Sequence, residues 1–144
     1  MEIKNRKIND YSIESTLTAG LILVGQEIKS LIKKEVDITG SRCMLRGENG
    51  KREAFLVGSH FKVITSIFST PYEATRDRGL LLKKNEIQYL DGEIQKNRVI
   101  IPVRIYKPNN SKKYKVELAI CRPLKKWDKR EKEKEKFIKK EIFD

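Results

Sequence analysis

A period-two alternation of apolar and polar side chains between residues 99 and 120 constrains the fold more than any other feature of this sequence. Branched aliphatic residues occupy every second position from Val99 to Ile105, and a second run has the same period at Tyr114, Val116, Leu118 and Ile120. This period predicts two half-buried strands. Pro102 cannot donate a ladder hydrogen bond, so we expect it at a sheet edge or at a bulge.

Shorter runs elsewhere predict the rest of a sheet. The expected strands are a run around Ile13 and Leu17 and the segments 21–24, 43–46, 54–57 and 61–68. The segment Gly47-Glu48-Asn49-Gly50 separates two of them, and its Asn-Gly pair is a strong hairpin signal. Six or seven short strands predict a mainly β domain. A small antiparallel barrel would close such a sheet and remove its exposed edges.

Two segments change to a helical period. A short helix is expected at 27–34, where apolar side chains share one face, and a second helix at 83–96, where Ile87, Leu90 and Ile94 do the same. Gly92 weakens the second helix by about 1 kcal/mol relative to Ala. The stretch 69–79 between them is irregular and leads into Leu80-Leu81-Leu82.

The last residues are unsuited to a core. No apolar residue occurs between Asp128 and Lys136, and residues 122–144 carry ten basic and six acidic side chains, a net charge of +4. Acidic and basic residues recur there at helical spacing, but each such pair adds only about 0.2–0.5 kcal/mol to a helix. We therefore expect a domain at 1–122 and a tail at 123–144 that is disordered alone and helical when docked.

The formal net charge is +12, from 32 Lys and Arg against 20 Asp and Glu in 144 residues. This excess favours a polyanionic partner, because basic groups displace the condensed counterions of a nucleic acid. An anionic membrane could also accept the charge, but no run approaches the roughly 20 apolar residues of a transmembrane helix. The N-terminal residues lack an apolar signal core, and Cys43 and Cys121 suit reduced thiols. We expect a cytoplasmic protein.

Catalytic chemistry finds little support in the sequence. His60 is the only histidine, and no nucleophile motif accompanies it, so a structural or surface role is favoured. One histidine and two distant cysteines do not make a common zinc site, and no glycine-rich phosphate loop occurs. We expect neither an enzyme nor a bound cofactor or metal.

Binding of RNA has more candidate residues. The polar, basic segment 1–10 is expected to form an N-terminal arm, and Tyr11 and Tyr72 are candidates to stack on bases. Taken alone, each candidate is better explained as a solvated charge or a packed ring, so only their arrangement can decide. The candidate phosphate contacts are Asn5, Arg6, Lys7, Lys29, Arg76, Arg78, Lys83 and Lys84.

Blocks of the sequence resemble, in the same order, the small protein B family, also called the SsrA-binding proteins. The most specific block is Ala19-Gly20-Leu21-Ile22-Leu23-Val24-Gly25-Gln26-Glu27-Ile28-Lys29-Ser30-Leu31, which is similar to the family's A-G-x-x-L-x-G-x-E-[VI]-K-S-[LI]. The other blocks are Asn5-Arg6-Lys7 with Asp10-Tyr11, Arg76-Asp77-Arg78 with Leu80-Leu81-Leu82 and Glu86-Ile87, Tyr114-Lys115-Val116-Glu117-Leu118-Ala119, and Trp127-Asp128-Lys129-Arg130.

The resemblance implies an antiparallel β-barrel of the oligonucleotide-binding (OB) type with two or three added helices. One face of it would bind the transfer-RNA-like domain of transfer-messenger RNA (tmRNA, also SsrA RNA), and Glu27 would join the RNA contacts. The protein, a monomer when free, would take part in trans-translation with alanyl-tmRNA and elongation factor Tu. The tail would enter the decoding centre and empty mRNA channel of a stalled ribosome through Trp127, Asp128, Lys129, Arg130, Lys132, Lys134 and Lys136.

The chain departs from the family pattern at four positions. Thr18 replaces a Glu before the Ala-Gly pair, and Lys83 replaces an Asn or His after the three leucines. Pro123-Leu124-Lys125 stands where the family has Gly-Lys-Lys, so that Pro123 would stiffen a hinge there, and Trp127 replaces a His or Tyr that stacks at the decoding centre. The alternative function is that of a ribosomal or other structured-RNA-binding OB-fold protein without a rescue role.

Overall fold

The computed structural model describes residues 2–48, 51–62 and 74–123. The described strands are β1 (Glu2–Lys4), β2 (Tyr11–Leu21), β3 (Val36–Asp37), β4 (Arg42–Arg46), β5 (Glu53–Val57), β6 (His60–Phe61), β7 (Arg78–Leu81), β8 (Val99–Tyr106) and β9 (Lys115–Pro123). The helices are α1 (Gly25–Ile32), α2 (Lys84–Gln95) and the 3₁₀ turn η1 (Ile8–Asp10). Seven strands form one antiparallel sheet in the order β1-β8-β9-β2-β7-β5-β4, and β3 pairs with β6.

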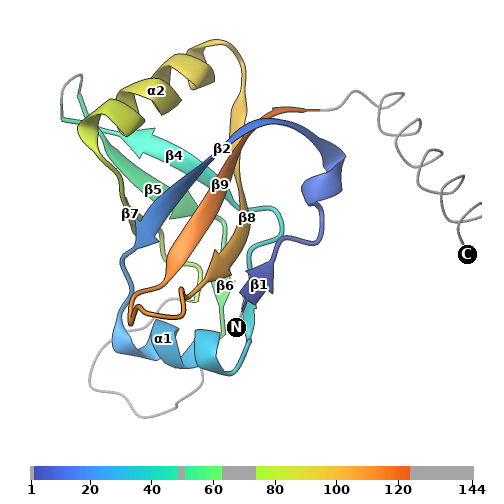
Figure 1. Cartoon of the computed structure of the whole chain (residues 1–144), viewed down its shortest axis with the longest axis vertical. Coiled ribbons are helices and arrows are strands. Elements are labelled where there is room, and N and C mark those ends of the chain that lie inside the picture. The colour runs from blue at the N-terminus through green and yellow to red at the C-terminus, as the bar shows by residue number, and fades with distance from the viewer. Residues whose placement is uncertain (1, 49–50, 63–73, 124–144) are drawn as a thin grey trace, which may run out of the picture.

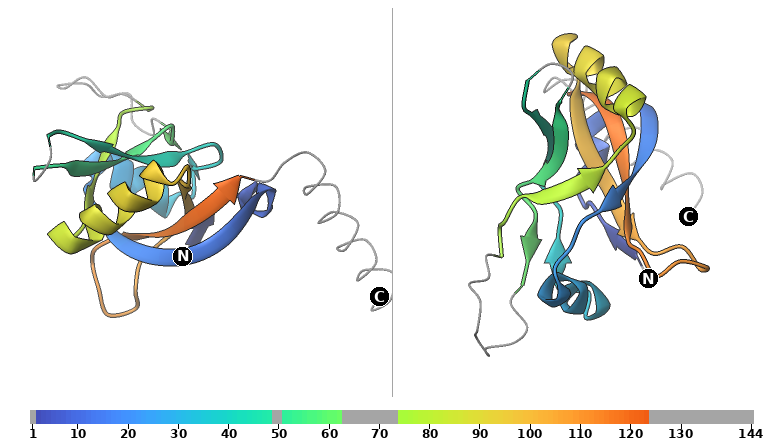
Figure 2. Two further views of the ribbon diagram at one scale, coloured as in Figure 1. Left: turned by 90° about the horizontal axis from the view of Figure 1, so that it is seen from above. Right: turned by 90° about the vertical axis from the view of Figure 1, so that its left-hand side faces the viewer.

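The large sheet curls around a single main core, with one helix at each end. α2 lies across one end of the curled sheet and α1 lies at the other end (Figure 1). Seen from above, α2 sits between the wall formed by β4 and β5 and the wall formed by β2, β9 and β8 (Figure 2). Leu31 of α1, Leu90 of α2 and Val116 and Leu118 of β9 are all 0% exposed in this core. Each helix therefore closes the core with its apolar face, as its period predicts.

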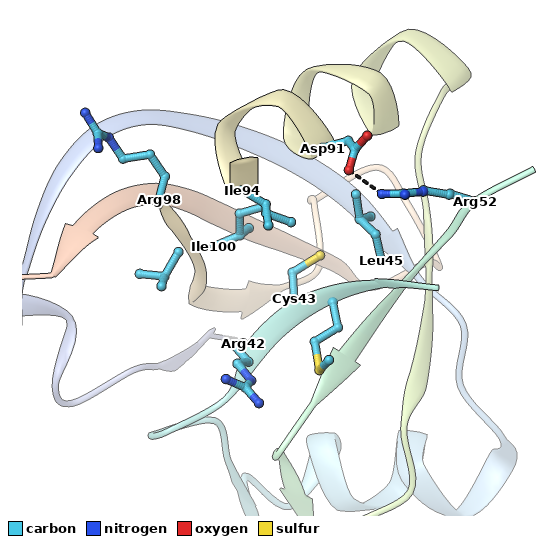
Figure 3. A pocket seen from close by; sticks show the side chains of 10 residues that line it. Arg42, Cys43, Leu45, Arg52, Asp91, Ile94, Arg98 and Ile100 are labelled. Atoms are coloured by element: carbon cyan, nitrogen blue, oxygen red, sulfur yellow. Dashed lines mark hydrogen bonds and ion pairs between the residues drawn. The ribbon is translucent and has the colours of Figure 1, made fainter. Parts of the chain in front are cut away.

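The expected barrel is curved but not closed by hydrogen bonds. Within the described residues β4 pairs with β5 and β1 with β8, which leaves β4 and β1 as the two edges of the sheet. A pocket of about 270 Å³ lies between β4, α2 and the start of β8 (Figure 3). Ile94 and the ion pair between Arg52 and Asp91 join α2 to this seam. Side chains of the helix thus line the seam between β4 and β8, which strand pairing does not close in the described residues.

The two alternating strands are confirmed as β8 and β9, and so is the bulge predicted at Pro102. The register between them shifts between Pro102 and Arg104, although β8 lies inside the sheet and not at its edge. Before the shift, Ile101 packs in a small second cluster, and after it Ile105 packs in the main core. The alternation predicted that Ile101 and Ile105 share one face, but the bulge directs them into two different clusters.

Three sequence-based boundaries were wrong. β2 continues through Gly20 to Leu21, so the segment 21–24 is not a separate strand. Gly20 is a close-packing position, because a Cβ there would lie 3.1 Å from Cβ of Leu81. β1 lies within the supposed arm and pairs with β8, and β7 begins inside the stretch expected to be irregular. A three-residue strand with one buried side chain, such as β1, carries too little period to be recognised.

The remaining local expectations agree with the structure where it describes them. The strands 43–46 and 54–57 correspond to β4 and β5, and the two expected helices correspond to α1 and α2. Most of the run 61–68, Tyr72 and the Asn-Gly pair of the hairpin lie outside the described residues.

Both cysteines are buried and neither forms a disulfide, as expected of reduced thiols, and burial raises the pKa of Cys43 to about 12. Among the described helices, neither the length nor the apolar content suffices to cross a membrane.

Candidate nucleic-acid interface

Three residues of the family-like blocks form one ionic cluster, the buried cluster, in which Glu27 and Arg78 are buried and only Arg76 reaches solvent. Glu27, in the first turn of α1, accepts hydrogen bonds from Arg76 Nη2 and Arg78 Nε at 2.5 Å each, and from the main-chain N–H of Val24 at 2.9 Å. The last bond is the return half of a capping box, which satisfies a donor just before the helix. The Arg78 guanidinium also stacks on Phe61, 4.2 Å from the ring centroid. Helix α1 is thereby tied to strand β7.

Arg78 is a structural hub. Its Nη2 donates to the carbonyl of Ala74 at 3.0 Å, and its Nη1 donates to the carbonyls of Arg76 and Ser59. Arg78 and Glu27 are both 0% exposed. A buried charge is tolerated only when it is paired and hydrogen-bonded, and this network supplies both. We therefore revise the prediction that Arg78 and Glu27 contact RNA directly, because neither presents any surface to it.

Asn5, which directly follows β1, has a comparable structural role. Its side-chain Nδ2 donates to the carbonyl of Pro102 at 2.9 Å, and its main-chain N–H donates to the carbonyl of Val103 at 2.9 Å. Its Oδ1 accepts from the N–H of Lys7 at 3.0 Å. Asn5 is 4% exposed, so it satisfies the carbonyls of the β8 bulge and does not face a ligand.

A shallow groove near the start of α2 includes one of the exposed candidates, Lys83. It has a volume of about 480 Å³ and is lined by Thr18 and Gly20 of β2, Lys83 and Glu86 before and in α2, and Lys115 of β9, among others. Glu86 accepts the N–H of Lys83 at 2.8 Å, which holds the main chain at the start of α2. Lys83 and Lys84 are both exposed.

Two of the four departures from the family pattern, Thr18 and Lys83, thus line one groove. Replacement of an acidic residue by Thr and of a neutral residue by Lys makes this groove more positive than the family pattern predicts. The sequence alone placed the two positions far apart. Their shared location follows from the pairing of β2 with β7, in which Gly20 is the partner of Leu81.

Other candidates lie apart from this groove. Arg6 and Lys7 are exposed beside η1, close to the start of β2, whereas Gly20 lies near the end of the same strand. Tyr11 is half-buried in the second cluster and pairs with Pro123 at the end of β9, so it packs against the sheet. Lys29 is exposed on α1. The predicted tail contacts Trp127, Asp128, Lys129, Arg130, Lys132, Lys134 and Lys136 lie outside the described residues.

Two basic residues near these sites were missed from the sequence. Lys115 lines the groove because its strand neighbour is Gly20, and Arg46 pairs with Asp77 at 2.6 Å. Each occurs in an otherwise ordinary strand pattern. The only available signal was that Lys115 lies inside a family-like block and that Arg46 ends a strand with a basic residue.

His60 is exposed on β6, which agrees with a surface role. No group of three or more His, Cys, Asp or Glu side chains in the segments that the structure describes is placed to hold a metal ion.

Comparisons with known proteins agree with the family blocks. The family model described as SmpB protein matches residues 2–143. The chain is 38% identical over 141 residues to the SsrA-binding protein of Rubrobacter xylanophilus, covering 96% of this chain and 90% of that protein. It is 42% identical over 139 residues to the SsrA-binding protein of Mycoplasmopsis synoviae, covering 96% of this chain and 91% of that protein.

The fold agrees as well. A solved structure described as "tmRNA-SmpB: a journey to the center of the bacterial ribosome" is similar with a TM-score of 0.68 and 31% sequence identity. The alignment covers 91% of this chain and 93% of that chain. Sequence and fold thus correspond over nearly the whole length, and the chain belongs to the SmpB family.

Proposed function

We propose that this protein binds tmRNA and acts with it on stalled ribosomes in trans-translation. The observation that carries the proposal is the full-length correspondence with proteins named SsrA-binding protein and with a tmRNA-SmpB structure. The role is one of binding in the cytoplasm, where ribosomes work, and it requires no catalytic residue.

The charge and shape of the described surface support an RNA partner. Lys115 belongs to β9, and the exposed Lys83 and Lys84 follow β7, so these lysines come from the two strands that flank β2 in the sheet. Structured RNA is recognised largely through its shape and its phosphates, which lysines bind as point charges. The overall charge of +12 favours the same partner.

A competition experiment tests this proposal. Labelled tmRNA is bound to the full-length protein at physiological salt, and unlabelled tmRNA or bulk transfer RNA is added as competitor. We expect tmRNA to displace the label at a much lower concentration than transfer RNA. Equal displacement by both RNAs would support the alternative, a general structured-RNA-binding protein without a rescue role.

The tail contributes a second part of the proposal. Residues 123–144 are basic and lack the apolar pattern of a core, so we propose that they enter the mRNA channel, become helical there and report its vacancy sterically. Truncation after Arg122 is then expected to leave tmRNA affinity nearly unchanged and to abolish peptide tagging on stalled ribosomes. Tagging by the truncated protein at the normal rate would contradict this role. An interaction of the complex with elongation factor Tu stays a prediction.

A further inference from the structure

A second basic cluster lies at the surface next to the buried one, and it centres on Asp77. The Arg46 guanidinium, from the end of β4, lies 2.6 Å from Oδ2 of Asp77. Arg76 Nη1 donates to the main-chain carbonyl of the same aspartate at 3.2 Å. Two arginines from different parts of the chain therefore flank a single residue.

The surface part of this cluster carries an excess of positive charge. Glu27 and Arg78 neutralise one another inside the protein, where both are 0% exposed. The exposed side-chain fractions are 47% for Arg46, 37% for Arg76 and 34% for Asp77. Counting all five groups, three guanidinium groups face two carboxylates, and the unmatched charge lies with the two arginines that solvent can reach.

Contacts within the protein fix the orientation of both arginine side chains, and both side chains stay partly exposed to solvent. Arg76 Nη2 is fixed by Glu27, and the Arg46 guanidinium stacks on Phe55, 5.0 Å from the ring centroid. The internal hydrogen bonds of Arg76 to described residues use only part of the N–H donors that a guanidinium carries. A guanidinium oriented in advance loses little freedom on binding, and its planar fork matches the oxygens of a phosphate.

An apolar strip adjoins the arginines on the same face of the sheet. Phe55 is the strand partner of Gly79, and the N–H of Ile22 donates to the carbonyl of Gly79 at 2.9 Å. A Cβ at Gly79 would lie 3.0 Å from Cδ1 of Ile22, so the glycine leaves room for Ile22 to lie across the strand. Ile22 is 48% exposed and the nearby Leu81 is 58% exposed. This strip offers an exposed apolar surface beside a cationic one.

We propose that Arg46 and Arg76 form a clamp for a phosphodiester group of RNA, with the ribose or base of that nucleotide on the strip at Gly79. This site rests on the proposed function, because it takes RNA as the ligand. Glu27 and Arg78 are then positioning residues, which hold Arg76 in place without touching RNA. Arg46 enters the RNA-binding surface as a residue outside the family-like blocks.

The test measures the dissociation constant for tmRNA over a series of KCl concentrations, with the full-length protein and its Arg46→Ala, Arg76→Ala and double variants. Loss of one phosphate contact is expected to lower the magnitude of the slope of log K against log salt concentration by about one. We expect each single variant to bind about tenfold more weakly near physiological salt and to lose part of this slope, and the double variant, which no longer holds the phosphate, to lose about one unit.

Arg42→Ala is the matched control. Arg42 is an exposed arginine on the same strand and the same face as Arg46, but it takes no part in the cluster. Its substitution is expected to leave the slope at the wild-type value. Thermal melting of each variant checks the fold, and Arg76→Lys, which keeps the charge but not the fork, replaces Arg76→Ala if that variant is unfolded. Arg76→Lys is expected to keep most of the slope and still bind more weakly.

The outcomes separate this site from the function on which it rests. Wild-type affinity and slope in both the Arg46 and the Arg76 variants would overturn the clamp, while tmRNA binding by the wild-type protein would stand. Equal affinity of the wild-type protein for tmRNA and transfer RNA would instead overturn the proposed function, whatever the variants do.

Discussion

Two ionic clusters in this protein have opposite compositions, and one is buried whereas the other is exposed to solvent. In the buried cluster one carboxylate, Glu27, binds two arginines, and Arg78 stacks on an aromatic ring at 4.2 Å. The exposed cluster is centred on Arg104, a different site from the one at Asp77. Arg104 donates to the carboxylates of Glu2 and Glu117 at 3.1 Å each, and it stacks on Tyr106, 4.2 Å from the ring centroid.

The two clusters differ mainly in how far solvent can reach their charged groups. The Arg78 side chain is 0% exposed, whereas that of Arg104 is 35% exposed. If Arg78 loses its partner, a charge is left without solvation, but water can replace either partner of Arg104. Hydrogen bonds to Glu117 and Glu2 raise the pKa of the Arg104 guanidinium above its ordinary value. Similar contacts thus have different weight according to burial.

The largest effect is expected from Arg78→Met. Removal of one partner of a buried pair leaves Oε2 of Glu27 buried without its hydrogen bond from Arg78, and such changes cost about 3–5 kcal/mol. Urea unfolding followed by circular dichroism measures the loss. A loss below about 1 kcal/mol would show that the buried cluster is no more important than an exposed one.

A double variant keeps this test decisive if Arg78→Met does not fold. Glu27→Gln together with Arg78→Met removes both charges at once, so its loss should be smaller than the sum of the two single losses. Strict additivity would mean that the two side chains do not act as a pair.

A smaller effect is expected from Arg104→Ala, and it should depend on salt. The screening length is about 10 Å at 0.1 M salt and about 3 Å at 1 M, so the contribution of the exposed ion pairs should shrink. We expect the difference in urea midpoint between wild type and variant to be well below that of Arg78→Met and to decrease at 1 M NaCl. A loss as large as that of Arg78→Met, and unchanged by salt, would remove the distinction between the clusters.

The smallest effect is expected at Asp37, an exposed carboxylate without a buried partner. The hydrogen bond from the main-chain N–H of Thr39, 2.9 Å long, lowers the pKa of Asp37 from its usual 3.8. A folded-state pKa below the unfolded one stabilises the protein above the unfolded pKa, and that gain is lost as the pH falls through the folded value. Asp37→Asn should therefore slightly lower the urea midpoint at pH 7 and leave it unchanged near pH 2. An equal shift at both pH values would assign the effect to something other than charge.

Local pattern was a good guide wherever one element decided the outcome. The alternation around Ile105 and Val116 identified β8 and β9, and the spacing of Leu31 and Leu90 identified the two helices that close the core. Local pattern failed where the structure of a segment depended on contacts with another element. β1 forms by pairing with the edge of β8, which its own three residues do not reveal. β2 continues through Gly20, where the side chain of Leu81 on the neighbouring strand fills the space that a Cβ would need.

The candidate site was predicted less completely than the fold. Residue type alone made Arg6, Lys29, Lys83 and Lys84 candidates, and all four are exposed. The same criterion also selected Arg78, which lies in the core and has no exposed surface. A basic residue in a family-like block can serve either RNA or the fold, and only burial distinguishes the two.

The sequence by itself determined the class of fold, the basic character of the surface and the family, because hydrophobic period, net charge and ordered blocks are properties of the chain alone. Only the tertiary structure decided that Glu27 meets Arg78, that Arg46 meets Asp77, and that the sheet stays open beside α2. The physical reason is that a period reports which way a side chain points along its own element. Which charge it then meets depends on strand order, and strand order arises from pairing between distant segments.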